Sequence, residues 1–383
     1  MTSELLNPRE QDVFKQVVEF CQKEVAPYCE QWEKDENLPR EIFTKAGKLG
    51  LMGMNTAPAL GGLGLRYVAS ALIVQEMAKY YAALALDIAA HNALSVGHIV
   101  AFGSEEQKKR VVPKLVSGEW IGAWALTEPS AGSDTGGLAT TATQTDKGWE
   151  ITGHKMFITQ GQRADLLVVM AVTGTNAQGK KEITSFLVEK KHVIPVRKIL
   201  TYGVKSSDTA ELRFDKAPAE LLGERGHGQE YALTVLDRGR IGVASLAVGI
   251  AQAALDHACT HALHRKQFGK AIADFEAIQW MIADSATELE AARLMTLRAA
   301  ELQDQGKRST KESAMAKLYT SEVANRVCNR ALQIHGGQGY TRDHPVERYL
   351  RDAKICEIGE GTSEVQRIVI SRHILKSYED PKV

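Results

Sequence analysis

The sequence predicts an α+β fold, mostly α-helical, that is built in three consecutive parts. Apolar residues recur at helical spacing over residues 1–123, alternating and β-branched runs replace them over 124–228, and long helical periodicity returns over 229–383. We therefore expect an N-terminal helical domain, a small antiparallel β domain and a C-terminal four-helix bundle with these boundaries. The order of helices, strands and helices argues against a parallel βαβ sheet.

The N-terminal part contains several segments with helical patterns. Glu10–Val25 and Arg40–Leu51 are amphipathic, and Val68–Ala101 is apolar enough to be buried. Gly61–Gly64 predicts a turn, because glycine tolerates positive φ. Ser104, followed by acidic residues and a glutamine, predicts the start of a further helix.

The middle part has the pattern of strands. Leu166–Thr173 and Ile183–Val188 are β-branched runs separated by a polar turn, and Gly148–Gly153 predicts another strand with a turn on either side. The segment Glu220–Gly228 is rich in glycine and charge, so we expect it to be the linker that leaves the β domain.

The C-terminal part contains long segments without helix breakers, which suit the helices of a bundle. These segments are Gly239–Arg265, Ile278–Gln305 and Thr310–Ile334.

Composition indicates an ordinary globular protein. Of 383 residues, 44% are hydrophobic and 25% are charged, and 47 basic residues balance 47 acidic ones. This balance gives no electrostatic case for binding nucleic acid or an anionic membrane, and no apolar run approaches the length of a spanning helix. With five unclustered cysteines and no signal-like N-terminus, we expect a soluble cytoplasmic protein, or a mitochondrial-matrix protein only if a transit peptide has been removed. No metal site is predicted, because His335 and His344 lack partners at ligand spacing.

One carboxylate has an unusual setting. Glu360 lies between Gly359 and Gly361, and the helix-start signal Thr362-Ser363 follows at once. We therefore expect Glu360 in a tight turn at the N-terminus of a helix, held at a cavity. The alternative from the residues alone is a helix-capping loop that happens to carry a charge.

The segment around Glu360, Arg351–Arg367 (RDAKICEIGEGTSEVQR), resembles the catalytic segment of the acyl-CoA dehydrogenase family, in which a glutamate followed by Gly-Thr-Ser removes the α-proton of an acyl thioester. Four more segments resemble the family in order: TEPSAGSD at Thr127–Asp134, GHKMFIT at Gly153–Thr159, HRKQFGK at His264–Lys270 and QIHGGQGY at Gln333–Tyr340. The resemblance implies the acyl-CoA dehydrogenase fold, with Glu360 as the catalytic base.

The resemblance also implies FAD as the cofactor. The positions that match FAD contacts in the family are Trp124, Leu126, Thr127, Ser133, Phe157, Ile158, Thr159, Arg265, Phe268, Gln333, Gly336, Gly337, Thr362 and Ser363. In the family, the segment with Gln333 reaches across a subunit interface, which implies a homo-oligomer, expected to be a tetramer, with an FAD site shared between subunits. Two positions depart from the family pattern: Phe157 stands where tryptophan is common, and Glu276 stands where a glutamine is usual.

For the acyl-CoA substrate, the implied contacts are Ser133, Asp237, Arg240 and Gly361. From the residues alone, Asp237 and Arg240 predict only a local ion pair at a helix start. Relatives specific for isovaleryl-CoA carry their base at the place of Gly239, so a glycine there keeps the base at Glu360. Electrons are expected to pass to an electron-transfer flavoprotein.

The acyl group is expected to be short, with room for a branch or a ring. Many straight-chain relatives have tyrosine just before the base, and Gly359 lacks that bulky side chain beside the acyl group. Ala85 takes the place of an arginine found in glutaryl-CoA relatives, which argues against that substrate. Asp87 lies in an otherwise apolar run, where a buried carboxylate needs a partner. It either bonds a neighbouring helix or acts as a second acid/base on a cyclohexane- or cyclohexenecarboxyl-CoA.

Alternatives of other kinds stay open. The same fold serves oxidases and nitroalkane oxidases, in which oxygen reoxidises the flavin, although the full EGTSE run favours a dehydrogenase. Outside enzymes, the alternative is a non-catalytic CoA-binding scaffold. A scaffold would be expected to lose the base or the flavin-binding turns, and this sequence keeps both.

Overall fold

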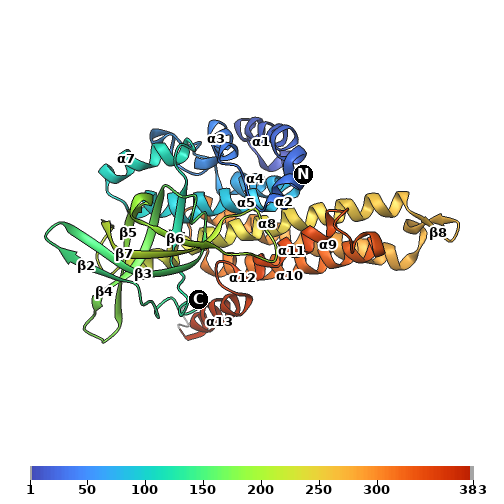
Figure 1. Cartoon of the computed structure of the whole chain (residues 1–383). Coiled ribbons are helices and arrows are strands. Elements are labelled where there is room, and N and C mark those ends of the chain that lie inside the picture. The colour runs from blue at the N-terminus through green and yellow to red at the C-terminus, as the bar shows by residue number, and fades with distance from the viewer. Residues whose placement is uncertain (1, 380–383) are drawn as a thin grey trace.

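The computed structural model describes residues 2–379. Figure 1 shows the N-terminal helices lying along one side of a long central helix, a β-sheet at one end of the molecule, and a bundle of long helices that runs to the opposite end. The α+β architecture expected from the sequence is confirmed. Secondary structure changes near residues 123 and 228, and the domain boundaries themselves stay a prediction.

The N-terminal part is helical, as expected. Its helices are α1 Pro8–Phe20, α2 Cys29–Asp35, α3 Arg40–Lys48, α4 Tyr67–Tyr80, α5 Ala82–Ala90, α6 Gly97–Phe102 and α7 Glu105–Val116, with π-helical segments at Cys21–Val25 and His91–Val96. The apolar run from Val68 is not one helix, because Tyr81 has an extended backbone that separates α4 from α5. Ser104 caps α7 through a reciprocal bond with Gln107, which confirms the predicted helix start.

The middle part is one seven-stranded sheet. Its strands are β1 Gly122–Ala125, β2 Thr141–Thr145, β3 Gly148–Thr159, β4 Leu166–Thr175, β5 Lys181–Glu189, β6 Ile194–Lys198 and β7 Thr209–Leu222. A purely antiparallel sheet is wrong, because β4 runs parallel to both β1 and β2. The β2–β3 hairpin lies between β1 and β4 in the chain, and it supplies a connection long enough for parallel pairing. Strand β7 also extends to Leu222, into the predicted linker.

The C-terminal part contains four main helices, α8 Gly228–His264, α9 Glu276–Asp304, α10 Thr310–His335 and α13 Ser363–Glu379. Helix α10 packs against the other three. The short helices α11 Val346–Ala353 and α12 Ile355–Ile358 precede α13, and a small hairpin, β8 Lys266–Gln267 and β9 Lys270–Ala271, follows α8. Because α8 begins at Gly228, the pair Asp237 and Arg240 lies within the helix and not at its start, as the sequence had suggested.

Two helical stretches, Ala82–Phe102 and Gly228–His264, are long and apolar enough to cross a membrane by length and composition, contrary to the expectation from the sequence. In the folded protein, 61% and 78% of their apolar windows are buried. Helix α8 packs against α4, α5, α9 and α10, so its apolar residues are largely used by the core.

Candidate functional site

The turn that carries Glu360 connects α12 to α13. Glu360 adopts a left-handed backbone with φ of 55°, and Gly361 follows with φ of 94°. The N–H of Gly359 donates to the carbonyl of Ile355 at 2.8 Å, which ends α12. A left-handed conformation is uncommon for a residue with a side chain, and it persists only where the surroundings hold it. The prediction of a tight turn before a helix is confirmed.

Two buried side chains hold the main chain of this turn. Lys317 in α10 donates from Nζ to the carbonyl of Gly361 at 2.7 Å. Gln366 in α13 donates from Nε2 to the same carbonyl at 2.9 Å and to the carbonyl of Glu360 at 3.3 Å. Both side chains are fully shielded from solvent. The Glu360 turn is therefore fixed by donors from two helices.

The carboxyl group of Glu360 is half-buried, and its Oε2 atom is shielded from solvent without a hydrogen-bond partner. Burial raises the pKa of Glu360 to about 7, against the opposing effects of the Lys317 and Arg240 cations. A carboxyl with a pKa near neutrality is well suited to accept a proton at physiological pH.

Helix α8 passes directly against this carboxyl group. A Cβ atom added to Gly239 would lie 1.9 Å from Oε2 of Glu360 and 2.9 Å from the side chain of Leu94. Glycine is therefore the residue that leaves room for the carboxylate. One residue further on, buried Arg240 is ion-paired with Asp237 at 2.8 Å.

Four buried side-chain atoms without hydrogen-bond partners belong to residues of this region: Glu360 Oε2, Arg240 Nε, Ser363 Oγ and Gln366 Oε1. Buried polar groups are normally paired, and each unpaired one is unfavourable. Such a concentration of unpaired donors and acceptors around one turn is typical of a site that binds a ligand.

The first group of predicted FAD residues lies where β1 and β3 end. The N–H of Met156 donates to the carbonyl of Thr127 at 2.8 Å, so the TEPSAGSD and GHKMFIT segments are directly joined. Phe157 has a left-handed φ of 59° and is 57% exposed. A strained, exposed aromatic residue suits a surface that a planar ligand covers. Trp124 packs beside Leu94, which links this group to Gly239 and Glu360.

Sequence reasoning missed the ion pair that holds these two segments together. Lys155 and Glu128 are buried and form an ion pair at 2.7 Å, and Lys155 also donates to the carbonyl of Leu126 at 2.8 Å. Glu128 accepts from the N–H groups of Ala139 and Thr140. The signal in the sequence was a carboxylate in the first motif and a lysine in the second, but nothing in the spacing showed that they pair.

Replacing Lys155 with methionine is expected to lower the free energy of unfolding by about 3–5 kcal/mol, because Glu128 is left buried without its cation. The variant is also expected to hold less FAD, since the segment at Leu126 loses its anchor. Chemical denaturation and flavin absorbance per chain measure both effects. Lys147→Met, at an exposed lysine in the β2–β3 turn, is the matched control. Equal stability and FAD content in the two variants would contradict this role.

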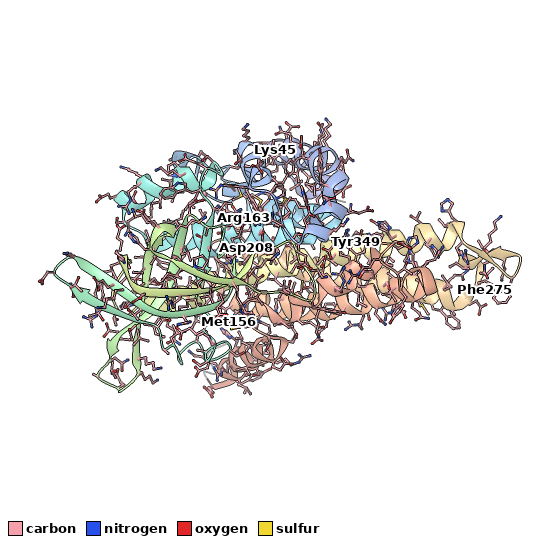
Figure 2. All side chains as sticks on the ribbon, viewed as in Figure 1. Lys45, Met156, Arg163, Asp208, Phe275 and Tyr349 are labelled. Carbon is pink, nitrogen blue, oxygen red and sulfur yellow. The ribbon has the colours of Figure 1, made fainter. Side chains whose placement is uncertain are left out.

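The second group of predicted FAD residues lies at the far end of the bundle. It comprises Arg265, Phe268, Gln333, Gly336 and Gly337, which follow or end α8 and α10. The two helix ends are adjacent, because the rings of His261 and His335 stack with centroids 4.2 Å apart. In Figure 2, Phe275, whose ring is 6.1 Å from that of Phe268, marks this tip, whereas Met156 marks the sheet.

Distance along α8 separates the second group from the Glu360 turn. Gly239 touches the Glu360 carboxylate and His264 ends the helix, a span of 25 residues or about 38 Å at 1.5 Å per residue. Phe268 at the tip is 93% exposed, and an added Cβ on Gly336 or Gly337 would meet no atom within 4 Å. One chain therefore does not bring both groups together around one small ligand.

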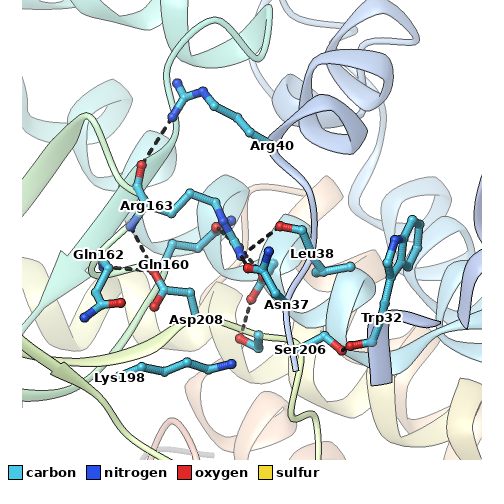
Figure 3. A network of polar contacts seen from close by, with 12 residues as sticks. Trp32, Asn37, Leu38, Arg40, Gln160, Gln162, Arg163, Lys198, Ser206 and Asp208 are labelled. Carbon is cyan, nitrogen blue, oxygen red and sulfur yellow. Dashed lines mark hydrogen bonds and ion pairs between the residues drawn. The ribbon is translucent and has the colours of Figure 1, made fainter. Parts of the chain in front are cut away.

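Asp87 belongs to a polar network between the N-terminal helices and the sheet. Figure 3 shows Arg163, Asn37 and Leu38 of this network from close by. The carboxylate of Asp87 accepts from Ser207 Oγ at 2.6 Å and lies 3.4 Å from the guanidinium of Arg163. Arg163 in turn bonds Asn37 and the backbone of Leu38. Burial raises the pKa of Asp87 to about 7 and Arg163 opposes this shift. The structure thus gives Asp87 a structural partner, and these bonds tie the N-terminal helices to the loops beside the sheet.

Two cavities are not lined by residues of the Glu360 turn. One of about 90 Å³ lies between α4, the π-helical segment His91–Val96 and α8, and one of about 700 Å³ lies between α2, α8 and α11. None of the site residues predicted from the sequence lines either cavity. Within residues 2–379, no three His, Cys, Asp or Glu side chains are grouped as metal ligands would be.

Comparison with protein families gives three matches in order along the chain. The N-terminal domain of acyl-CoA dehydrogenase matches residues 7–119, the middle domain matches 123–217 and the C-terminal domain matches 226–375.

Individual proteins are similar over nearly the whole chain. A probable acyl-CoA dehydrogenase of Bacillus subtilis, YngJ, is 44% identical over 97% of this chain and 99% of its own. The mitochondrial short-chain specific acyl-CoA dehydrogenase of Bos taurus is 44% identical over 94% of this chain and 88% of its own. Butyryl-CoA dehydrogenase from Megasphaera elsdenii has a similar structure, with a TM-score of 0.93, 38% identity and coverage of 97% and 99%. A solved structure described as an electron transferring flavoprotein of Acidaminococcus fermentans contains a similar chain, with a TM-score of 0.94, 39% identity and the same coverage.

Proposed function

This chain belongs to the acyl-CoA dehydrogenase family, and from this premise we propose that it oxidises a short-chain acyl-CoA to the 2-enoyl-CoA with Glu360 as the base. It is an FAD-dependent oxidoreductase, as members of this family are. The observation that carries the proposal is the carboxyl group of Glu360, which has a buried oxygen without a hydrogen-bond partner and a pKa near neutrality. The turn that carries it is held by hydrogen bonds from two helices. A non-catalytic scaffold would have no use for such a group.

Particular residues of the chain are proposed to transfer the proton, stabilise the charge that develops and bind the substrate. Ionised Glu360 takes the α-proton of the thioester on its free Oε2 atom. Negative charge then develops on the thioester carbonyl, and the backbone N–H of Glu360 would stabilise it. When bound, FAD supplies an acceptor for the β-hydride at N5. Arg240 and Asp237 are proposed to contact the CoA moiety.

The residues present fit FAD. The exposed, strained Phe157 and the joined Thr127 segment suit one face of an isoalloxazine ring. The cationic and glycine-rich second group suits a diphosphate, since a guanidinium pairs well with phosphate and open glycines allow close approach. Because this group lies about 38 Å along α8 from the Glu360 turn, we propose that it serves the FAD of a second subunit. A homotetramer is the assembly that we propose.

For the acyl group, we propose a short chain with space for a branch or a ring. The atoms nearest to a Cβ added on Gly359 belong to Ile355 and lie at 3.4 Å or more, so close packing does not require glycine there. The short-chain specificity named for the Bos taurus relative supports a small pocket. The alternative that uses Asp87 on a cyclic acyl group is disfavoured, because Arg163 and Ser207 already bond that carboxylate.

An anaerobic titration of the purified protein with butyryl-, isobutyryl-, cyclohexanecarboxyl- and a longer straight-chain acyl-CoA tests this function. We expect flavin absorbance to bleach with a short substrate. Gly359→Tyr is the matched variant, and it should lose branched or cyclic substrates by about tenfold or more relative to butyryl-CoA, because a side chain now fills that space. An FAD-loaded protein that no acyl-CoA bleaches would contradict the proposal.

We also propose an electron-transfer flavoprotein as the electron acceptor. The similar chain in the Acidaminococcus fermentans structure supports this partner. Oxygen consumption with substrate and without an added acceptor would favour the oxidase alternative instead. A cytoplasmic location stays a prediction.

A further inference from the structure

Lys317 is a buried charge that the proposed reaction does not yet use. It lies in the interior of α10 and is fully shielded from solvent. Burying an ammonium group is unfavourable unless bonds or charges compensate. Its Nζ donates to the carbonyl of Gly361 at 2.7 Å, one residue after Glu360. A lysine kept in such a place is expected to act on the turn that it touches.

The Glu360 turn needs external support. Glu360 and Gly361 both have positive φ, and the first of these residues carries a side chain. The carbonyl of Gly361 is the one point that receives donors from two different helices, Lys317 in α10 and Gln366 in α13. Together with the bond from Gln366 to the carbonyl of Glu360, these bonds fix the direction of the two peptide groups that follow the carboxylate-bearing residue.

The charges around the carboxyl group make Lys317 distinctive. Arg240 of α8 also faces it, but Arg240 is ion-paired with Asp237 at 2.8 Å, so its field is partly cancelled. The hydrogen bond of Lys317 goes to a neutral carbonyl, that of Gly361. The other titratable groups that act on Lys317 are Cys356 and Glu357 of α12, and Glu357 is ion-paired with Lys354.

We propose that Lys317 is a positioning residue for the base: it fixes the turn through the carbonyl of Gly361, and its charge favours the ionised form of Glu360. The proposal rests on the proposed function, in which Glu360 accepts the α-proton. Consistent with it, the Lys317 cation opposes the burial-driven rise in the pKa of Glu360, and Glu360 opposes the burial-driven fall in the pKa of Lys317.

Three substitutions separate the two roles. Lys317→Met removes the donor and the charge, Lys317→Gln keeps a donor without charge, and Lys317→Arg keeps the charge. Each variant, loaded with FAD, is mixed anaerobically with substrate, and the rate of flavin reduction is followed against pH. Infrared spectra recorded against pH follow the protonation of Glu360 independently of activity. The carboxylic-acid stretching band of Glu360 is identified as the one that is missing in Glu360→Gln.

We expect the midpoint of both titrations to rise by about one pH unit in Lys317→Met and Lys317→Gln, so that reduction at low pH slows about tenfold. Lys317→Arg should keep the midpoint of the parent enzyme. The rate at high pH should fall further in Lys317→Met than in Lys317→Gln, since only glutamine can still bond Gly361. Lys311→Met, at a partly exposed lysine of the same helix, should change neither quantity.

Unchanged midpoints in both neutral variants would overturn the charge role, and equal rates at high pH would overturn the positioning role. If one neutral variant does not fold, as FAD content and melting temperature would reveal, the midpoint of the other compared with Lys317→Arg still decides the charge role, and its rate at high pH compared with the parent enzyme decides the positioning role. Failure of the proposed function is distinguishable, because either no acyl-CoA would then bleach the parent enzyme or Glu360→Gln would reduce its flavin at the parent rate, whatever the Lys317 variants do.

Discussion

Glu360→Gln is expected to slow flavin reduction by acyl-CoA by about 10²- to 10⁴-fold, the range that a general base supplies. Glutamine has nearly the same shape as glutamate but cannot accept the α-proton. The bonds that hold the turn come from Lys317 and Gln366 to backbone carbonyls, so they survive the substitution. The variant should therefore fold and retain FAD. Rapid anaerobic mixing measures the rate, and a rate within tenfold of the parent enzyme would refute the assignment.

The same substitution is expected to stabilise the protein at alkaline pH. Burial raises the pKa of Glu360 from 4.5 to about 7, so the folded state disfavours the ionised form. The free energy of unfolding therefore falls as pH rises from about 4.5 through about 7, and above that the loss is complete. Glutamine removes this loss. At pH 8 we expect Glu360→Gln to be more stable by about 1–3 kcal/mol, and at pH 4 the two proteins should be nearly equal.

Gly239→Ala is expected to reduce activity by about a hundredfold, because a methyl group 1.9 Å from Oε2 must displace the carboxylate. Catalytic geometry depends on fractions of an ångström, so a displaced carboxylate is expected to lose its alignment with the α-proton. Alanine is a better helix former than glycine by about 1 kcal/mol, which limits any loss of stability.

Gly242→Ala provides the matched control for this substitution. Gly242 lies one turn further along α8, and an added Cβ there would meet only the side chain of Ala89, at 3.5 Å. The two variants make the same chemical change in the same helix. Steady-state turnover should fall in Gly239→Ala and be kept in Gly242→Ala. Equal turnover in the two variants would show that α8 does not constrain Glu360.

Local signals in the sequence were sufficient where a few neighbouring residues decide the structure. The cap at Ser104 and the turn at Glu360 both follow from residues within a few positions of each other. The strand pairing of β4 was mistaken because alternation predicts a strand but not the direction of its neighbour.

The supports of the site were beyond the sequence for a different reason. Lys317 and Gly361 are 44 positions apart, and nothing in the helical pattern of α10 distinguishes a buried lysine from a solvated one. The pairing of Lys155 with Glu128 and of Asp87 with Arg163 likewise depends on how separate elements pack. The proposal that Glu360 is the base came from local motif resemblance, whereas the contacts that would tune it required the tertiary structure.

The length of α8 has a consequence for inheritance. It carries Gly239 beside the base of its own chain and ends near the cationic tip proposed to serve a neighbour. Under this arrangement, an amino-acid change at the tip impairs the site of the adjoining subunit, while the site of the altered chain depends on its partner's tip. In a mixed assembly, a chain with a defective tip would therefore still have a working site if its partner's tip is intact. Two alleles with defects at opposite ends of the helix would complement each other in this way.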